Sequence, residues 1–169
     1  MRVTEVLRSH LWAIGFFLCT CAIGYGARWA IGDIYSSAEA TDLIQALSRA
    51  GLYLASAIVT AAATTLALML TLIGMLKRME SEFNEQTYRD VDLIALLASF
   101  TMASGLAVLL AFTLPVGEFD TLPPRWYIYL YEGMFAATVL TVAMFAATVA
   151  ILYRTVRRVI KRMTPGREV

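Results

Sequence analysis

Four hydrophobic stretches without a charged residue constrain this chain more than any other feature. They cover residues 11–27, 51–76, 93–115 and 133–153. At about 1.5 Å rise per residue, a helix needs roughly 20 residues to cross about 30 Å of hydrocarbon. Three stretches reach that length, and the first comes close to it before Arg28. We therefore expect an all-α integral membrane protein, a bundle of four transmembrane helices.

Composition agrees with this class. The 169 residues are 59% hydrophobic and 16% charged, which is too apolar for an ordinary soluble domain. Four spans at about 11–31, 51–76, 92–115 and 127–153 leave little chain for a second folded unit. We expect residues 1–169 to form a single membrane domain with a basic tail at 154–169.

The basic residues predict the orientation. Eleven of the 14 Lys and Arg residues precede the first span, separate the second from the third, or follow the fourth. By the positive-inside rule, these segments face the cytoplasm. We expect both termini inside and the protein in the inner (plasma) membrane of a cell. A cleaved signal peptide is the alternative for the first span, but its 17-residue apolar run exceeds the usual 7–15 and no clean Ala-x-Ala site follows.

The segment before the second span has its own pattern. Ala38, Leu43, Ile44 and Leu47 recur at near-helical spacing among charged residues. This predicts a short amphipathic helix, which either lies at the outer surface or runs straight into the second span.

Small residues indicate which helix faces pack, because helices in lipid associate by close approach and not by the hydrophobic effect. The third span carries a strict four-residue row, which winds around the helix and favours a steep right-handed crossing. Its members are Ala95, Ser99, Ala103, Ala107 and Ala111. On the fourth span, Ala136 and Ala143 share a face with Glu132, so we expect them to pack as well.

Glu132 and Arg28 are the charges that stand out near the spans. Counting along the helices places both near the outer edge of the hydrocarbon, each beside small residues. We expect them to form an ion pair between the first and fourth spans, because pairing removes much of the cost of either charge in a medium of low dielectric constant. The alternative is that Glu132 is a proton or cation site. A polar path would then use the hydroxyls of the second span, Ser56, Thr60, Thr64 and Thr71.

Catalysis and cofactors find no support in the sequence. The lone histidine, His10, provides neither a bis-histidine haem site nor a membrane-embedded serine–histidine pair. The acidic residues between the second and third spans have no neighbouring His or Cys and no EF-hand spacing, which favours a solvated loop over a metal site. We expect no enzyme activity, cofactor or metal.

The segment after the fourth span is basic and suits contact with anionic lipid headgroups. Its basic residues next to the span are Arg154, Arg157, Arg158, Lys161 and Arg162. Because they are held against the membrane, we expect no nucleic-acid partner. We expect a helix-packing or interaction unit, either a homo-oligomer or an accessory subunit of a membrane complex. The alternative is a small oligomeric ion channel or transporter that uses Glu132 and the hydroxyls of the second span.

Overall fold

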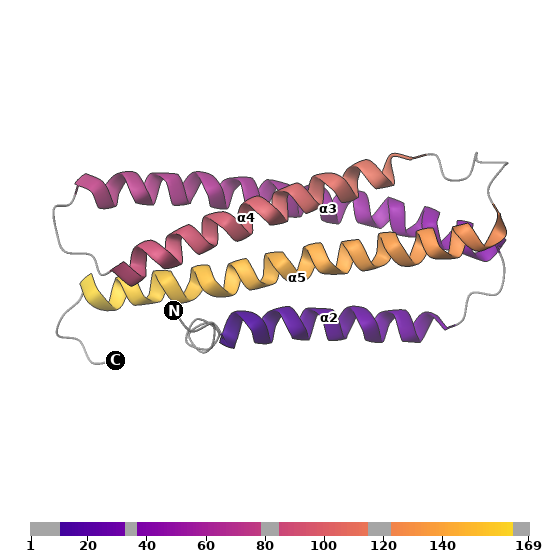
Figure 1. Ribbon diagram of the computed structural model, residues 1–169, viewed down its shortest axis with the longest axis horizontal. Coiled ribbons are helices and arrows are strands. Elements are labelled where there is room, and N and C mark those ends of the chain that lie inside the picture. The colour runs from indigo at the N-terminus through magenta and orange to yellow at the C-terminus, as the bar shows by residue number, and fades with distance from the viewer. Residues whose placement is uncertain (1–10, 33–36, 79–84, 115–122, 164–169) are drawn as a thin grey trace.

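The computed structural model describes residues 11–32, 37–78, 85–114 and 123–163, and these residues form four helices and no strand. The helices are α2 (Leu11–Ile31), α3 (Ser37–Arg78), α4 (Glu85–Phe112) and α5 (Pro124–Met163). They lie lengthwise beside one another and alternate in direction, so α2 begins and α5 ends towards the same end of the bundle (Figure 1). Each contains a stretch that is long and apolar enough to cross a membrane. The prediction of an all-helical chain with four such helices is confirmed for the described residues.

Two of the helices are much longer than a membrane span requires. α3 has 42 residues and α5 has 40, so each is about 60 Å long, roughly twice the thickness of the hydrocarbon. The segment 38–49, for which we considered a separate amphipathic helix, forms the first turns of α3 without a break. Ala40 and Ile44 are buried there, whereas Glu39 and Asp42 are exposed. The basic segment after the fourth span is likewise helical, because α5 continues as far as Met163.

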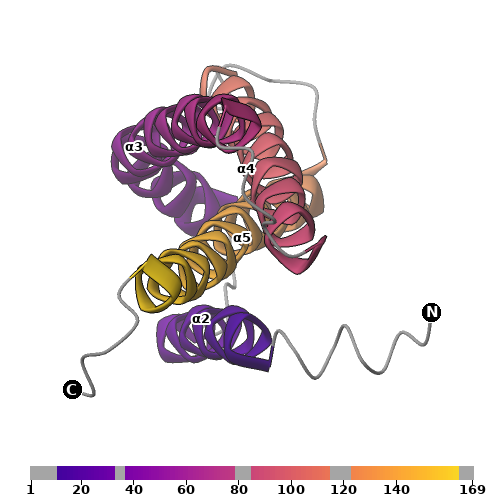
Figure 2. The same ribbon diagram turned by 90° about the vertical axis from the view of Figure 1, so that its left-hand side faces the viewer.

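The four helices do not contribute equally to the bundle. α3, α4 and α5 pack against one another, whereas the main contact of α2 is with α5. Viewed along the bundle, α2 lies beside α5 on the side away from α3 and α4 (Figure 2). The fold is therefore a three-helix unit with α2 attached to one of its helices.

The buried face of α4 differs from the one we predicted. From Val91 onward, its buried positions alternate in steps of three and four: Val91, Ile94, Ala98, Thr101, Gly105, Val108 and Phe112. This is the spacing by which side chains interlock in left-handed helix packing. It is not the four-residue row that led us to expect a steep right-handed crossing.

Of that predicted row, Ser99, Ala103 and Ala107 are exposed, and Ala95 and Ala111 are partly buried. At about 100° per residue, the three exposed members lie on the opposite side of α4 from its buried positions. The reason is size. The interior of the three-helix unit accommodates Ile94, Val108 and Phe112 alongside small residues. The face that α4 turns towards its neighbours is therefore set by its bulky residues and not by its alanine row.

Two apolar clusters fill the interior of the three-helix unit. One contains Ile44, Val108, Phe112, Tyr131 and Met134, from α3, α4 and α5. The other contains Met69, Val91, Ile94, Ala147 and Ile151, together with Ala13 from α2. Between the clusters, α3 and α4 come close at Gly105, where an added Cβ would lie 2.6 Å from Val59 Cγ2. Glycine at this position is what allows that approach.

Candidate functional site

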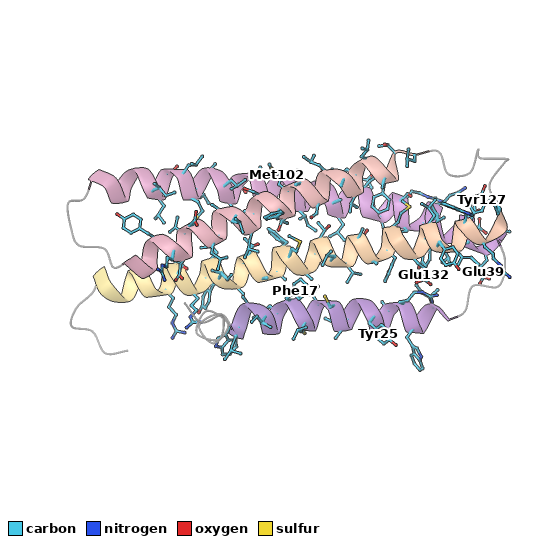
Figure 3. All side chains as sticks on the ribbon, in the orientation of Figure 1. Phe17, Tyr25, Glu39, Met102, Tyr127 and Glu132 are labelled. Carbon is cyan, nitrogen blue, oxygen red and sulfur yellow. The ribbon has the colours of Figure 1, made fainter. Side chains whose placement is uncertain are left out.

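The structure brings together the two charges that the sequence singled out. Arg28 Nε donates to Glu132 Oε1 at 3.0 Å, and Arg28 Nη2 donates to the same oxygen at 2.5 Å. Glu132 lies between α5 and α2, near the end of the bundle opposite to the start of α2 (Figure 3). The pair therefore links the first and the last of the four helices.

Local sequence explains why these side chains meet. Gly24 lies one turn before Arg28 and is buried against α5, where an added Cβ would be 2.5 Å from Val139 Cγ1. Val139 in turn lies two turns after Glu132. In this antiparallel arrangement, the close approach at Gly24 brings the next turn of α2 level with Glu132.

Arg28 also makes a contact at the end of its own helix. Its Nη1 donates to the carbonyl oxygen of Gly32 at 2.6 Å, and Gly32 has the positive φ of 83° typical of the residue after a helix end. A cation in the last turn also interacts favourably with the helix dipole. One guanidinium thus binds the carbonyl of the residue that follows α2 and a carboxylate of α5.

The pair is only partly shielded from its surroundings. The side chains of Arg28 and Glu132 are 24% and 45% exposed. Next to Glu132, Tyr131 is buried and stacks on Phe135 with 6.0 Å between ring centroids, so Tyr131 points into the three-helix unit while Glu132 points to α2. With its carboxylate held by Arg28, Glu132 has the geometry of an attachment point between helices and not that of an open cation site.

The predicted polar path does not form within one chain. Ser56, Thr60, Thr64 and Thr71 are all exposed on α3. The three threonine hydroxyls donate to carbonyl oxygens of their own helix, those of Ser56, Ala61 and Ala67. Glu132 lies on a different helix and faces α2. The two parts of the channel or transporter hypothesis are therefore not brought together.

The two alanines predicted to pack on α5 differ in burial. Ala143 is completely buried, whereas Ala136 is exposed. Ala136 lies only one turn from Glu132. α5 contacts α2 on one side and α3 and α4 on another. A residue on the same face as Glu132 is therefore not necessarily buried.

The basic residues after the fourth span are described in part. The side chains of Arg154 and Arg157 line a groove between α2 and α5. Arg158, Lys161 and Arg162 belong to the helical backbone of α5, but their side chains lie outside the described part of the structure. Their predicted contact with anionic headgroups stays a prediction.

Sequence reasoning missed the hydroxyls that the structure buries. Thr101, Thr138, Thr141 and Thr148 are buried, and each donates to a carbonyl oxygen one turn earlier in its helix. Thr141 Oγ1 also lies 3.2 Å from Ser104 Oγ on α4, which allows it to donate across the helix interface. The seven-residue spacing of Thr141, Thr148 and Thr155 was the available signal, because that interval repeats the inward face of a packed helix.

A buried carboxylate was missed as well. Asp90 was assigned to a solvated acidic loop, yet it lies in the second turn of α4 and is only 4% exposed. The helix begins earlier than the apolar run suggested and turns Asp90 inward together with Val91. The expectation of a solvated loop is wrong for this residue.

No family model, curated protein or solved structure matches this chain.

Proposed function

We propose that this chain is a non-enzymatic multi-pass membrane protein that associates with membrane-spanning helices of other subunits through the outward face of α4. It acts as a homo-oligomer or as an accessory subunit of a membrane complex. The observation that carries the proposal is the exposure of Ser99, Ala103 and Ala107 on the side of α4 opposite its buried face. The chain does not use this close-approach surface to pack its own described helices.

The physical argument rests on what drives association in lipid. Lipid tails are as apolar as leucine, so helices gain from meeting mainly where small side chains permit close backbone contact. Along α4, Ala103 lies between the exposed Leu96 and Leu110, with the smaller exposed residues Ser99 and Ala107 one turn to either side. A helix of a second copy can approach this row of small residues without any change in the three-helix unit.

Self-association is the version of this proposal that the chain itself can test. Two copies with different tags are co-expressed and solubilised gently, and co-purification of one tag with the other is measured. Ala103→Leu should reduce co-purification at least about tenfold, a loss of roughly 1.4 kcal/mol, and leave the thermal stability of the monomer unchanged. The matched control is Ala67→Leu, at an exposed alanine of α3. Equal co-purification of wild type and Ala103→Leu, or a collapse of the monomer, would count against the proposal.

We also propose that both termini face the cytoplasm and that the protein resides in the inner membrane. Support comes from the distribution of the 14 basic residues together with the arrangement in which α2 begins and α5 ends at one end of the bundle. Reporter fusions at both termini and single-cysteine labelling near Ala38 and Asp120 test the orientation. Labelling of the C-terminus from outside would overturn it.

A further inference from the structure

A long apolar groove runs between the beginning of α2 and the end of α5. It encloses about 770 Å³, within the roughly 300–1,000 Å³ usual for small-molecule sites. Trp12 and Phe16 form its α2 wall, and the α5 side extends from Val142 to Arg157. The groove lies far along the bundle from the pair of Arg28 and Glu132.

The groove arises from side-chain size. Ala13 of α2 is buried in the same cluster as Ala147 and Ile151, which brings the two helices together on one side. On the groove side, α5 presents the small residues Ala146 and Ala150 between larger neighbours. The aromatic side chains of α2 do not fill the space above these alanines, so the groove stays open.

Its two ends differ chemically. The lining from Val142 to Val149 is apolar, whereas Arg154 and Arg157 lie at the other end. None of the described residues that line the groove is acidic. From Val142 to Arg154 the helix rises about 18 Å, close to the roughly 15 Å of one hydrocarbon leaflet.

Aromatic residues mark the charged end as interfacial. Trp12 and Tyr153 both line the groove, and both are mostly exposed. Trp and Tyr concentrate at the level of lipid headgroups. An amphiphile in the groove would therefore place its polar part beside the two arginines and its chain towards the middle of the bilayer.

We propose that this groove is a binding site for an anionic phospholipid, with an acyl chain along Val142 to Val149 and the headgroup phosphate at Arg154 and Arg157. A guanidinium is well suited to phosphate because it presents several N–H donors in one plane. The proposal is more specific than attraction of a basic tail to a charged surface, since it requires the apolar groove as well as the charge. It does not depend on the proposed self-association through α4.

Tryptophan quenching in the full chain tests the site. Trp29→Phe and Trp126→Phe leave Trp12 as the single tryptophan, and both replaced residues are exposed. The protein is reconstituted in phosphatidylcholine vesicles, and phosphatidylglycerol or phosphatidylcholine with brominated chains is titrated in as a minor component. Trp12 should prefer brominated phosphatidylglycerol by about fivefold or more, the factor that corresponds to about one basic contact near the surface.

Two variants separate the groove from surface charge. Arg157→Gln, at an exposed position, should remove most of the preference for phosphatidylglycerol. Ala146→Phe fills the groove without changing any charge, and it should reduce quenching by the anionic lipid to the level of phosphatidylcholine. The matched controls are Arg125→Gln, at the opposite end of α5, and Ala67→Phe, on an exposed face of α3. Neither control should change the preference.

Each other outcome overturns the proposal. Equal quenching by the two lipids would mean ordinary boundary lipid. Loss of preference in Arg157→Gln but not in a folded Ala146→Phe would mean attraction to the basic surface only. Absence of quenching by either lipid would mean that protein, such as a second copy of this chain, covers the groove. Because Arg157→Gln changes an exposed side chain, it decides the role of charge even if Ala146→Phe fails to fold.

Discussion

α2 and the three-helix unit of α3, α4 and α5 are both built from apolar membrane-length helices, yet they are held in different ways. In α2, two described residues are buried, Ala13 and Gly24, whereas α5 has buried residues along its length from Tyr131 to Thr155. The three-helix unit is joined along its length by side chains that interlock at steps of three and four. α2 is held at a few points: Ala13, Gly24 against Val139, and the pair of Arg28 and Glu132.

The difference shows that high hydrophobicity does not bury a helix in a membrane. Mean apolarity decides whether a helix inserts, since the bilayer is the solvent for its side chains. Which faces pack depends on small residues, shape and polar contacts. α2 is long and apolar enough to cross a membrane, but it presents large exposed side chains such as Trp12, Ile23 and Trp29. Its attachment depends on the few positions where it can approach α5 closely.

The largest effect should come from the three-helix unit. Gly105→Leu would drive a side chain into Val59, whose Cγ2 lies 2.6 Å from the added Cβ. Both neighbouring helices are fixed by other contacts, so we expect a loss of about 3 kcal/mol in the free energy of unfolding, at the upper end for overpacking. Titration with denaturing detergent measures it. Gly74→Leu is the control, because no described atom lies within 4 Å of a Cβ built there. Equal losses in the two variants would contradict the interlocked packing.

A smaller and more local effect is expected at the attachment of α2. Gly24→Leu would collide with Val139, which lies 2.5 Å from the added Cβ. α2 can move away from α5, so we expect a loss of about 1–3 kcal/mol with the three-helix unit intact. Hydrogen exchange should increase in α2 and stay low in α4. Gly26→Leu, on the open side of α2, should change neither quantity. Equal increases in α2 and α4 would mean that the chain unfolds as one unit.

The ion pair should contribute less than the close contact at Gly24. Glu132→Gln and Arg28→Gln should each destabilise the protein, and the double variant should lose less than the two single losses combined. With side chains 24% and 45% exposed, we expect a coupling of about 1 kcal/mol, the upper end for solvent-exposed pairs. A double-mutant cycle of unfolding free energies gives the value. Strict additivity of the two single losses would mean that the pair does not help to hold α2 against α5.

The smallest effect concerns the hydroxyls. Thr141→Val removes the contact with Ser104 across α4 and α5 and should cost about 0.6 kcal/mol, the average for hydrogen bonds between helices in lipid. Thr60→Val is the control, because its exposed hydroxyl donates to Ser56 of the same helix, and it should cost less. The same detergent titration compares the two. An equal or larger loss of unfolding free energy in Thr60→Val would indicate that another protein surface packs on the outward face of α3.

The four helices and their alternation are predictable from the sequence alone, because a bilayer requires long apolar segments with internally satisfied backbone groups. It also pointed to Arg28 and Glu132, since two opposite charges at similar depth in a medium of low dielectric constant gain by pairing. Which helix faces are buried could not be predicted and became clear from the packed structure. The predicted row at Ser99, Ala103 and Ala107 is outside and the seven-residue repeat of Thr141, Thr148 and Thr155 is inside. In lipid every apolar face is compatible with its surroundings, so hydrophobic pattern does not distinguish inside from outside. The buried face is set by shape complementarity between particular helices, and this complementarity is a property of the packed bundle.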